Sequence, residues 1–493
     1  MAIDKPVVVE RGTTAIRVVC NANGRFADAP SVSVHPWLKR TLTEYEWDVR
    51  RKCNVVKYQY FLYDRNTGYL HLPSQTLPYL LDYLRSCRLE HQLVETGPNP
   101  ASTIDVEYQG DFEHREYQEQ AIDFLTSDQT MKALSLITGG GKTFVAARTI
   151  LTLKLRTLII LPAYLVDQWS TVFSSLSDAK VAVLRGSDSI QKLYTSGYQN
   201  DADIFLASIN TIQKYAIRTS HYEALPELRE FLREMQFGIK IVDECHLNFH
   251  ANVMIDIQSD IKHNIYLSAT HMRSSKNSNQ IFRRIYPDEV RYDDGQVAKY
   301  VNVTQVNYSL GRVDERYVIT PRGYSTFKYE KWMLKRVSKL NQFLDKVWGP
   351  VVEEYYTSLR KPGQKLLVLI GLTDFGSMLV EWFQTNYPSL YCSEYFNATG
   401  DEVLDEADII VSTVGSCGTG KDLQNLRTMI VLPSFAADTL NLQALGRLRK
   451  LPDGDTPEFV YLINTEIVAH RRHAKTRQEL FKPEARQFRV VTI

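Results

Sequence analysis

Short apolar runs alternate with amphipathic segments through much of the chain. Between about Asp111 and Thr270 the apolar runs are ALSLI, TLIIL, VAVL, DIFLAS, FGIKIVDE and NIYLSAT. These runs have little polar face, whereas the intervening LVDQWSTVFSSL repeats its apolar residues at helical spacing. Strands buried on both faces and separated by crossover helices are typical of a parallel α/β sheet. The pattern therefore predicts a doubly wound parallel sheet over this stretch.

The same alternation restarts near Lys365, with KLLVLIG, ADIIVST, RTMIVL and EFVYLIN separated by helical segments such as GSMLVEWFQ and NLQALGRLRK. The first hundred residues differ, because VVKYQYFLYD and GYLHLP flank a hairpin-like turn and LPYLLDYL follows as a short helix. We therefore expect three domains. They are a small α+β domain over residues 1–105, which we expect to bind nucleic acid, and two α/β domains over residues 106–305 and 306–493, the second ending in a basic segment.

Composition narrows the function only slightly. The 493 residues carry a formal net charge of +1, so any binding of a polyanion must depend on local patches. The six cysteines include no C-x-x-C pair, which argues against a zinc site or a disulfide framework. The N-terminus lacks the pattern of a secretory signal, and the apolar runs are too short to span a membrane. We therefore expect a cytoplasmic protein that does not enter a membrane.

A glycine-rich loop follows the first predicted strand, in the stretch ITGGGKTF. In a phosphate-binding loop, backbone N–H groups and the start of the following helix would surround an anion. Lys142 would then reach the β and γ phosphates of a nucleotide, and Thr143 would bind Mg²⁺. The loop residues of this reading are Thr138, Gly139, Gly140, Gly141, Lys142 and Thr143. Leu136 replaces the small residue that opens the usual pattern, and a simple turn before a helix remains an alternative.

Two adjacent carboxylates follow a later apolar strand, in GIKIVDECH. Asp243 would hold the metal ion, and Glu244 would orient and deprotonate the attacking water. A solvated acidic turn is the structural alternative, although His246 in the next position but one weakens it.

Asp-Glu-Cys-His resembles the second motif of superfamily 2 helicases, and other motifs of that family occur in order. Gln118 resembles the glutamine that reads adenine, LPAYLVDQW resembles a segment that contacts the nucleic-acid backbone, and Ser268-Ala269-Thr270 resembles the motif that couples hydrolysis to strand separation. Gly418 to Asp422, with Gly420 and Asp422 at the nucleotide, resembles the fifth motif. The resemblance implies two RecA-like domains in tandem that bind ATP and Mg²⁺, with Ser268 and Thr270 as coupling residues.

The segment Gln443 to Lys450 resembles the sixth motif of this family. On a continuous helix that advances about 100° per residue, Gln443, Arg447 and Lys450 would share one face, and Arg449 would lie nearly opposite Arg447. We therefore predict Arg447 as the principal arginine finger and Lys450 as the second basic group. Pro452 leaves Arg449 open as an alternative, because an unwound turn would let its side chain swing in.

The N-terminal module and the compact motor resemble the phage UvsW type of branch-migration helicase and the XPB-like group. The resemblance implies action on branched DNA, such as forks and Holliday junctions, with RNA:DNA hybrids as a further substrate, by a monomer in the cytoplasm of an infected bacterium. Three basic segments could contact phosphates: residues 39–57, 271–284 and 470–489. We interpret His470 and His473 as surface residues of the last segment.

Two other functions remain open. The chain could be the motor of a restriction or remodelling assembly, which translocates on duplex DNA without opening it. It could also be a nucleotide-gated binding protein without hydrolysis, for which Leu136 and Lys450 are the only support.

Overall fold

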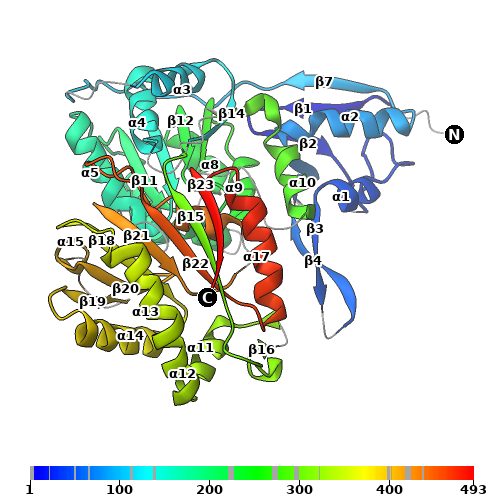
Figure 1. Cartoon of the computed structure of the whole chain (residues 1–493). Coiled ribbons are helices and arrows are strands. Elements are labelled where there is room, and N and C mark those ends of the chain that lie inside the picture. Colours follow the sequence, from blue (N-terminus) through cyan, green and yellow to red (C-terminus); the bar gives the residue numbers. More distant parts are fainter. Residues whose placement is uncertain are drawn as a thin grey trace. The chain divides into compact units, whose positions relative to one another are not determined.

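The computed structural model describes residues 5–493 except 22, 49–50, 65–66, 111–114, 137–139, 220–226, 269–275, 294–298, 321–322, 397–399, 401, 417–422 and 436–437. Residues 217–219, 276–277, 315, 438–439 and 443 are described without their side chains. The chain forms two compact units, one of residues 1–136 and 140–294 and the other of residues 295–493 (Figure 1). Within the described ranges, no helix is long and apolar enough to cross a membrane.

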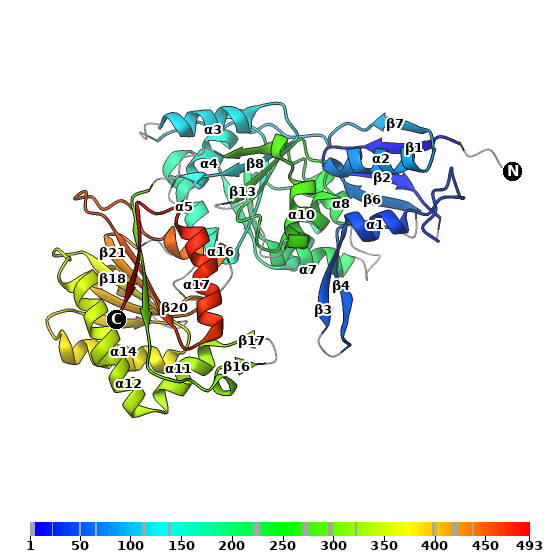
Figure 2. The ribbon, with the colours of Figure 1, turned by 45° about the vertical axis from the view of Figure 1, so that its right-hand side comes forward.

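A small α+β module opens the first unit. Its sheet has the order β5 (Leu62–Tyr63), β6 (Tyr69–Pro73), β2 (Ala15–Val19), β1 (Val7–Arg11) and β7 (His91–Glu95). The helices α1 (His35–Thr41) and α2 (Leu77–Ser86) accompany this sheet, and a short 3-10 turn precedes α2 (Ser74–Thr76). A separate antiparallel hairpin, β3 (Thr43–Asp48) and β4 (Cys53–Gln59), extends away from the module in both views (Figures 1 and 2).

The first α/β lobe contains a parallel sheet of seven described strands. Their order is β10 (Val181–Leu184), β11 (Ile204–Ser208), β9 (Thr157–Leu161), β12 (Ile239–Val242), β13 (His263–Ser268), β8 (Met131–Ser135) and β14 (Arg291–Asp293). The helices are α3 (Glu116–Thr126), α4 (Lys142–Leu153), α5 (Val166–Leu176), α6 (Ser187–Thr195), α7 (Ile209–Thr219), α8 (Leu228–Glu234), α9 (Phe249–Asp256) and α10 (Lys276–Ile285), and two 3-10 turns lie at Ala163–Leu165 and Asp288–Val290.

Side chains along each strand point alternately to the two faces of the sheet, and each face of this lobe carries its own hydrophobic core. In β9, Ile159 packs with the core of α3, α4 and α5, whereas Leu158 and Ile160 face the core of α6 to α10. Successive strand side chains point to opposite faces, so a strand that is apolar throughout supplies both cores.

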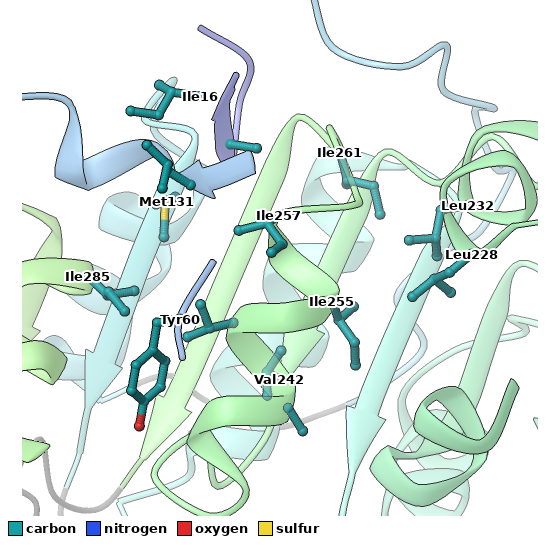
Figure 3. Packing of buried hydrophobic residues seen from close by; sticks show 14 of the residues in the cluster. Ile16, Tyr60, Met131, Leu228, Leu232, Val242, Ile255, Ile257, Ile261 and Ile285 are labelled. Carbon is teal, nitrogen blue, oxygen red and sulfur yellow. The ribbon is translucent and has the colours of Figure 1, made fainter. Parts of the chain in front are cut away.

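The N-terminal module shares the second of these cores. Ile16 and Tyr60 from the module belong to the same buried cluster as Val242, Ile255 and other residues of the lobe (Figure 3). Polar contacts reinforce the packing, because Arg17 forms a buried ion pair with Asp260. The module and the first lobe are therefore one packed body.

The second unit holds another parallel sheet of seven described strands. Their order is β19 (Cys392–Tyr395), β20 (Ile409–Thr413), β18 (Lys365–Ile370), β21 (Leu426–Val431), β22 (Glu458–Asn464), β15 (Asn302–Tyr308) and β23 (Gln487–Thr492). The helices are α11 (Thr326–Leu334), α12 (Val337–Phe343), α13 (Gly349–Val352), α14 (Thr373–Asn386), α15 (Glu402–Glu406), α16 (Asp438–Leu445) and α17 (Val468–Phe481). Two π-helical turns (Leu344–Trp348 and Glu353–Thr357), a 3-10 turn (Glu315–Tyr317) and a small hairpin of β16 (Ile319–Thr320) and β17 (Gly323–Tyr324) complete it.

The two faces of this sheet also carry separate cores. Leu366 and Val368 of β18 pack with α11 to α14, whereas Leu367 and Leu369 pack with α16 and α17. The predicted fold class is confirmed: two doubly wound parallel sheets in tandem follow a small N-terminal α+β domain.

Helix α17 corrects one interpretation. His470 and His473 are buried rather than at the surface, because α17 packs one face on the sheet. His473 Nδ1 contacts Ser434 Oγ at 3.0 Å, and the backbone N–H of Asn464 donates to His470 Nδ1. Burial lowers the pKa of His470 to about 3, so this imidazole is a neutral structural group.

Candidate functional site

The predicted site residues of the first lobe lie at one edge of its sheet. The glycine-rich loop follows β8, Ser268 ends β13 and Asp243 follows β12, and these three strands are neighbours in the sheet order. Because carboxyl ends of parallel strands meet at one edge, the three segments converge there. Backbone bonds fix the carboxylate segment between its neighbours: Asp243 N–H donates to Ile160 of β9, and Cys245 N–H donates to Leu267 of β13.

Helix α4 begins at Lys142, directly after the loop, so its positive end points back to the loop. Thr138 and Gly139 lie outside the described residues. Gly141 adopts a left-handed φ of 85°, and a Cβ there would lie 2.5 Å from the Gln118 side-chain nitrogen. Lys142 Nζ donates to the Leu136 carbonyl at 3.3 Å, and the Leu136 side chain is buried in the core of the lobe.

Gln118 supports the loop in this structure. Its Nε2 donates to the Gly140 carbonyl at 3.0 Å, its Oε1 accepts from the Arg115 N–H, and Tyr117 Oη donates to the same Gly140 carbonyl. This side chain therefore ties the start of α3 to the phosphate loop.

Asp243 is a buried carboxylate held by two donors. The indole Nε1 of Trp169 donates to its Oδ2 at 2.9 Å, and the backbone N–H of Glu244 donates to its Oδ1 at 2.9 Å. Burial and then the neighbouring charge of Glu244 raise the pKa of Asp243 to about 6, while the Trp169 bond and the charge of Lys142 oppose the rise. A cation beside this carboxylate would therefore be strongly favoured.

Oxygen donors of this kind fit Mg²⁺. The carboxylate of Asp243 and the hydroxyl of Thr143, on the first turn of α4, are the ligand type that hard divalent cations prefer. With the like charge of Glu244 nearby, a bound cation would relieve both repulsion and desolvation.

Glu244 has a left-handed φ of 50°, which non-glycine residues adopt rarely. His246 Nδ1 lies 3.3 Å from Glu244 Oε2 and 2.8 Å from Ser268 Oγ. The imidazole therefore bridges the predicted water-activating carboxylate and the predicted coupling serine. Thr270, the second coupling residue, lies outside the described residues.

Trp169 is a site residue that the sequence reasoning missed. Its spacing with Leu165 and Phe173 predicted a core position on α5, and the ring is fully buried. Only its hydrogen bond to Asp243, 74 residues away, gives it a second role. It joins the segment LPAYLVDQW to the acidic motif, and nothing in the local pattern distinguished it from other apolar residues.

A groove lies beside the same segment. It is an open groove of about 320 Å³, lined by residues at or just after the ends of β9, β10 and β11, among them Asp167, Arg185, Gly186, Ser208 and Thr211. Gly186 N–H donates to Thr211 Oγ1, and Ser208 Oγ lies 3.0 Å from the same hydroxyl. The groove therefore offers hydroxyl groups and a guanidinium at the strand ends.

The sixth-motif segment of the second lobe corrects the predicted helical phase. Helix α16 ends at Leu445, and the N–H groups of Arg447 and Leu448 donate to the carbonyls of the residues three positions earlier, Ala444 and Leu445. Residues 443–450 are therefore not one regular helix, and the argument that placed Gln443, Arg447 and Lys450 on a common face is wrong. Gly446 follows the last helical residue of α16, a position where glycine is common.

Beyond the helix end, the three basic side chains have different surroundings. Arg447 is half-buried, Lys450 is exposed, and Arg449 Nη1 donates to the Gly446 carbonyl at 2.7 Å. The side chain of Gln443 is not described, and Gly420 and Asp422 lie outside the described residues.

Comparisons with known proteins concern the family and the fold. Residues 111–273 match the family "Type III restriction enzyme, res subunit". No curated protein sequence matches the chain. Among solved structures, a type ISP restriction-modification enzyme, LlaBIII bound to DNA, is 14% identical with a TM-score of 0.52 and covers 78% of this chain, which spans 32% of that one.

Two further structures are similar over most of the chain. T4 UvsW is 17% identical, covers 99% of each chain and has a TM-score of 0.37. S. cerevisiae Dbp5 bound to RNA and ADP BeF3 is 11% identical, covers 84% of this chain and 93% of its own, and has a TM-score of 0.47. The two lobes are RecA-like domains, and the resemblance to superfamily 2 helicases is confirmed.

Proposed function

We propose that this chain is an ATP-driven DNA helicase or translocase that remodels branched DNA, such as forks and Holliday junctions, with RNA:DNA hybrids as a further substrate. The observation that carries this proposal is the convergence of the phosphate loop, the acidic pair and Ser268 at one sheet edge, bridged by His246. Phosphate binding, metal binding and a link to the next motif are the parts that nucleotide-driven motion needs.

Each residue has a defined role in this proposal. Lys142 neutralises the β and γ phosphates, Thr143 and Asp243 hold Mg²⁺, and Glu244 orients and deprotonates water. The bound Mg²⁺ would supply charge neutralisation at the phosphates. In the second lobe, Gly420, Asp422, Gln443, Arg447 and Lys450 would complete the site, with Arg447 as the arginine finger.

The groove beside α5 supports nucleic acid as the partner. Its hydroxyl groups and Arg185 suit phosphate oxygens, which receive most hydrogen bonds in protein–DNA complexes. Trp169, on α5, donates a hydrogen bond to Asp243. Binding of nucleic acid beside α5 would therefore affect the position of the carboxylate that is proposed to hold Mg²⁺.

A second candidate function has its own support. The family match and the similarity to LlaBIII, both restriction enzymes, favour a motor that translocates on duplex DNA without separating strands and works in a larger assembly.

One set of assays distinguishes these functions. ATP hydrolysis is measured without nucleic acid and with single-stranded DNA, duplex, a four-way junction and an RNA:DNA hybrid, and strand products are scored on the last two. Products from the junction support the first candidate, and duplex-stimulated hydrolysis without products supports the second. Lys142→Ala should abolish hydrolysis, whereas Lys192→Ala, at an exposed position on α6, should not. Absence of nucleic-acid stimulation in the wild type would contradict both.

A further inference from the structure

The β3–β4 hairpin exposes an aromatic face that the core does not use. Beyond its base, Tyr45 pairs with Val56 and Trp47 pairs with Asn54, so these four side chains share one face of the ribbon. Trp47 is 60% exposed, and Tyr45 and Val56 are also exposed. Large exposed aromatic residues side by side on a projecting ribbon usually mark an interaction surface.

The other parts of the hairpin are charged. Glu46 and Asp48 occupy the opposite face, and Asp48 Oδ1 accepts from the Arg51 N–H, which supports the turn. Arg51 and Lys52, next to this turn, expose their side chains, and Arg51 Nε also lies 3.8 Å from Asp48 Oδ2. The hairpin thus combines stacking surfaces with cations at its end. This combination suits unpaired nucleobases and their phosphates better than it suits a purely apolar partner.

A β-bulge separates this exposed part from a buried base. The register shifts between Glu44 and Tyr45, and Lys57 is the extra residue on β4. Below the bulge, buried Glu44 accepts hydrogen bonds from Tyr60 Oη at 2.7 Å and from Ser278 Oγ of α10 at 2.5 Å. The bulge therefore separates the exposed part of the hairpin from the part that is anchored to the lobe.

The base is anchored to the helix that follows the acidic motif. The Tyr58 ring stacks on His250 with centroids 4.7 Å apart, His250 Nε2 lies 2.9 Å from the Gln59 carbonyl, and the Tyr60 ring packs on Phe249. Asn252 of the same helix donates to the carbonyls of Cys245 and Leu247. Helix α9 therefore contacts both the segment after Asp243 and Glu244 and the base of the hairpin.

From this geometry we propose that the β3–β4 hairpin meets nucleic acid where the duplex opens, with Trp47 and Tyr45 stacking on unpaired bases. The inference rests on the proposed function, and it assigns strand separation to an element outside the two RecA-like domains. The buried end of the hairpin, which is anchored to α9 and α10, holds the aromatic face at a fixed position relative to the lobe that carries Asp243 and Glu244.

The test uses the full chain with Tyr45 and Trp47 both replaced by Ala. Matched controls are Trp47→Phe, which keeps a stacking ring, and Leu93→Ala, which removes an exposed apolar residue from β7 of the same module. One readout is strand product from a forked DNA, compared with ATP hydrolysis in the absence of nucleic acid. The other is fluorescence of 2-aminopurine placed at the fork, without ATP.

Loss of stacking should reduce the yield of strand product from forked DNA and the quenching of 2-aminopurine by about fivefold or more. Each stacked base contributes substantially to affinity. We expect the double variant to lose strand products and 2-aminopurine quenching while its ATP hydrolysis without nucleic acid stays within about twofold of wild type. Both controls should behave as wild type.

Three outcomes would overturn the inference. They are unchanged strand separation by the double variant, unchanged 2-aminopurine quenching by the double variant, and an equal defect in Leu93→Ala. The 2-aminopurine measurement does not need ATP. If the wild type shows no stimulated hydrolysis, the proposed function fails, yet quenching that depends on Trp47 would still support base stacking by the hairpin.

Discussion

Replacement of Trp169 by Phe should impair Mg²⁺ use in a manner that depends on pH. The change removes the indole N–H that donates to Asp243 Oδ2 while it keeps an aromatic ring in the core. A hydrogen bond to a charged group contributes about 1.5–3 kcal/mol, and one pKa unit corresponds to about 1.4 kcal/mol. The pKa of Asp243, already raised to about 6, should therefore rise by a further ~1–2 units.

The direction and size of the change in Mg²⁺ requirement follow from competition between a proton and Mg²⁺ for the Asp243 carboxylate. A carboxyl with a raised pKa is protonated over a wider range, so less of it is available to Mg²⁺ near neutrality. A shift of about 1.5 units from 6 would lower the ionised fraction at pH 7 roughly fourfold and leave it nearly complete at pH 9. The Mg²⁺ concentration for half-maximal hydrolysis should rise by about that factor at pH 7 and recover at pH 9.

The assay is a Mg²⁺ titration of ATP hydrolysis at several pH values. Trp348→Phe is a matched control, because Trp348 is equally buried but its indole nitrogen has no hydrogen-bond partner among the described residues. A variant whose Mg²⁺ requirement equals that of wild type at pH 7, or is raised equally at pH 9, would refute the reasoning. A defect of the same form in Trp348→Phe would show that lost packing alone is responsible.

Two further predictions concern the second lobe. Arg447→Ala should reduce ATP hydrolysis by about a thousandfold, as loss of an arginine finger does. Arg449→Ala should reduce hydrolysis less, because the Arg449 guanidinium donates to the Gly446 carbonyl. Equal losses of steady-state hydrolysis in the two variants would identify Arg449 as a finger too. Burial raises the pKa of Glu330 to about 8 although the amides of Gly371 and Leu372 donate to it. Its contribution to stability is then complete below the unfolded pKa near 4.5 and is lost as pH rises toward 8. The urea midpoint of wild type should fall relative to that of Glu330→Gln between pH 5 and pH 8.5, and parallel midpoints would contradict this.

Several features of the site were predictable because they depend on short-range order. An apolar run predicts a strand. The glycine-rich loop or the two carboxylates that come directly after the run must then lie at the carboxyl end of that strand. The glycine-rich loop that leads to Lys142, as well as Asp243 and Ser268, could therefore be assigned to strand ends of the first lobe, and parallel pairing then brings those ends to one edge.

The sixth motif shows where local reasoning failed. The expected common face of Gln443, Arg447 and Lys450 required an unbroken helix, and α16 stops at Leu445. Gly446 was a visible signal for that end, since glycine commonly follows the last helical residue. The burial of His470 and His473 carried no such signal, because neighbouring basic residues made α17 look like a surface helix.

By itself, the sequence determined the two α/β sheets, the small first domain and the order of the motifs, since hydrophobic periodicity and turn chemistry act over a few residues. Only the tertiary structure decided which distant side chains meet. Trp169 reaches Asp243, His246 joins Glu244 to Ser268, and Tyr58 stacks on His250. Such contacts depend on strand order and on how helices pack over the sheet, and these are set by the burial of the whole apolar core rather than by any local pattern.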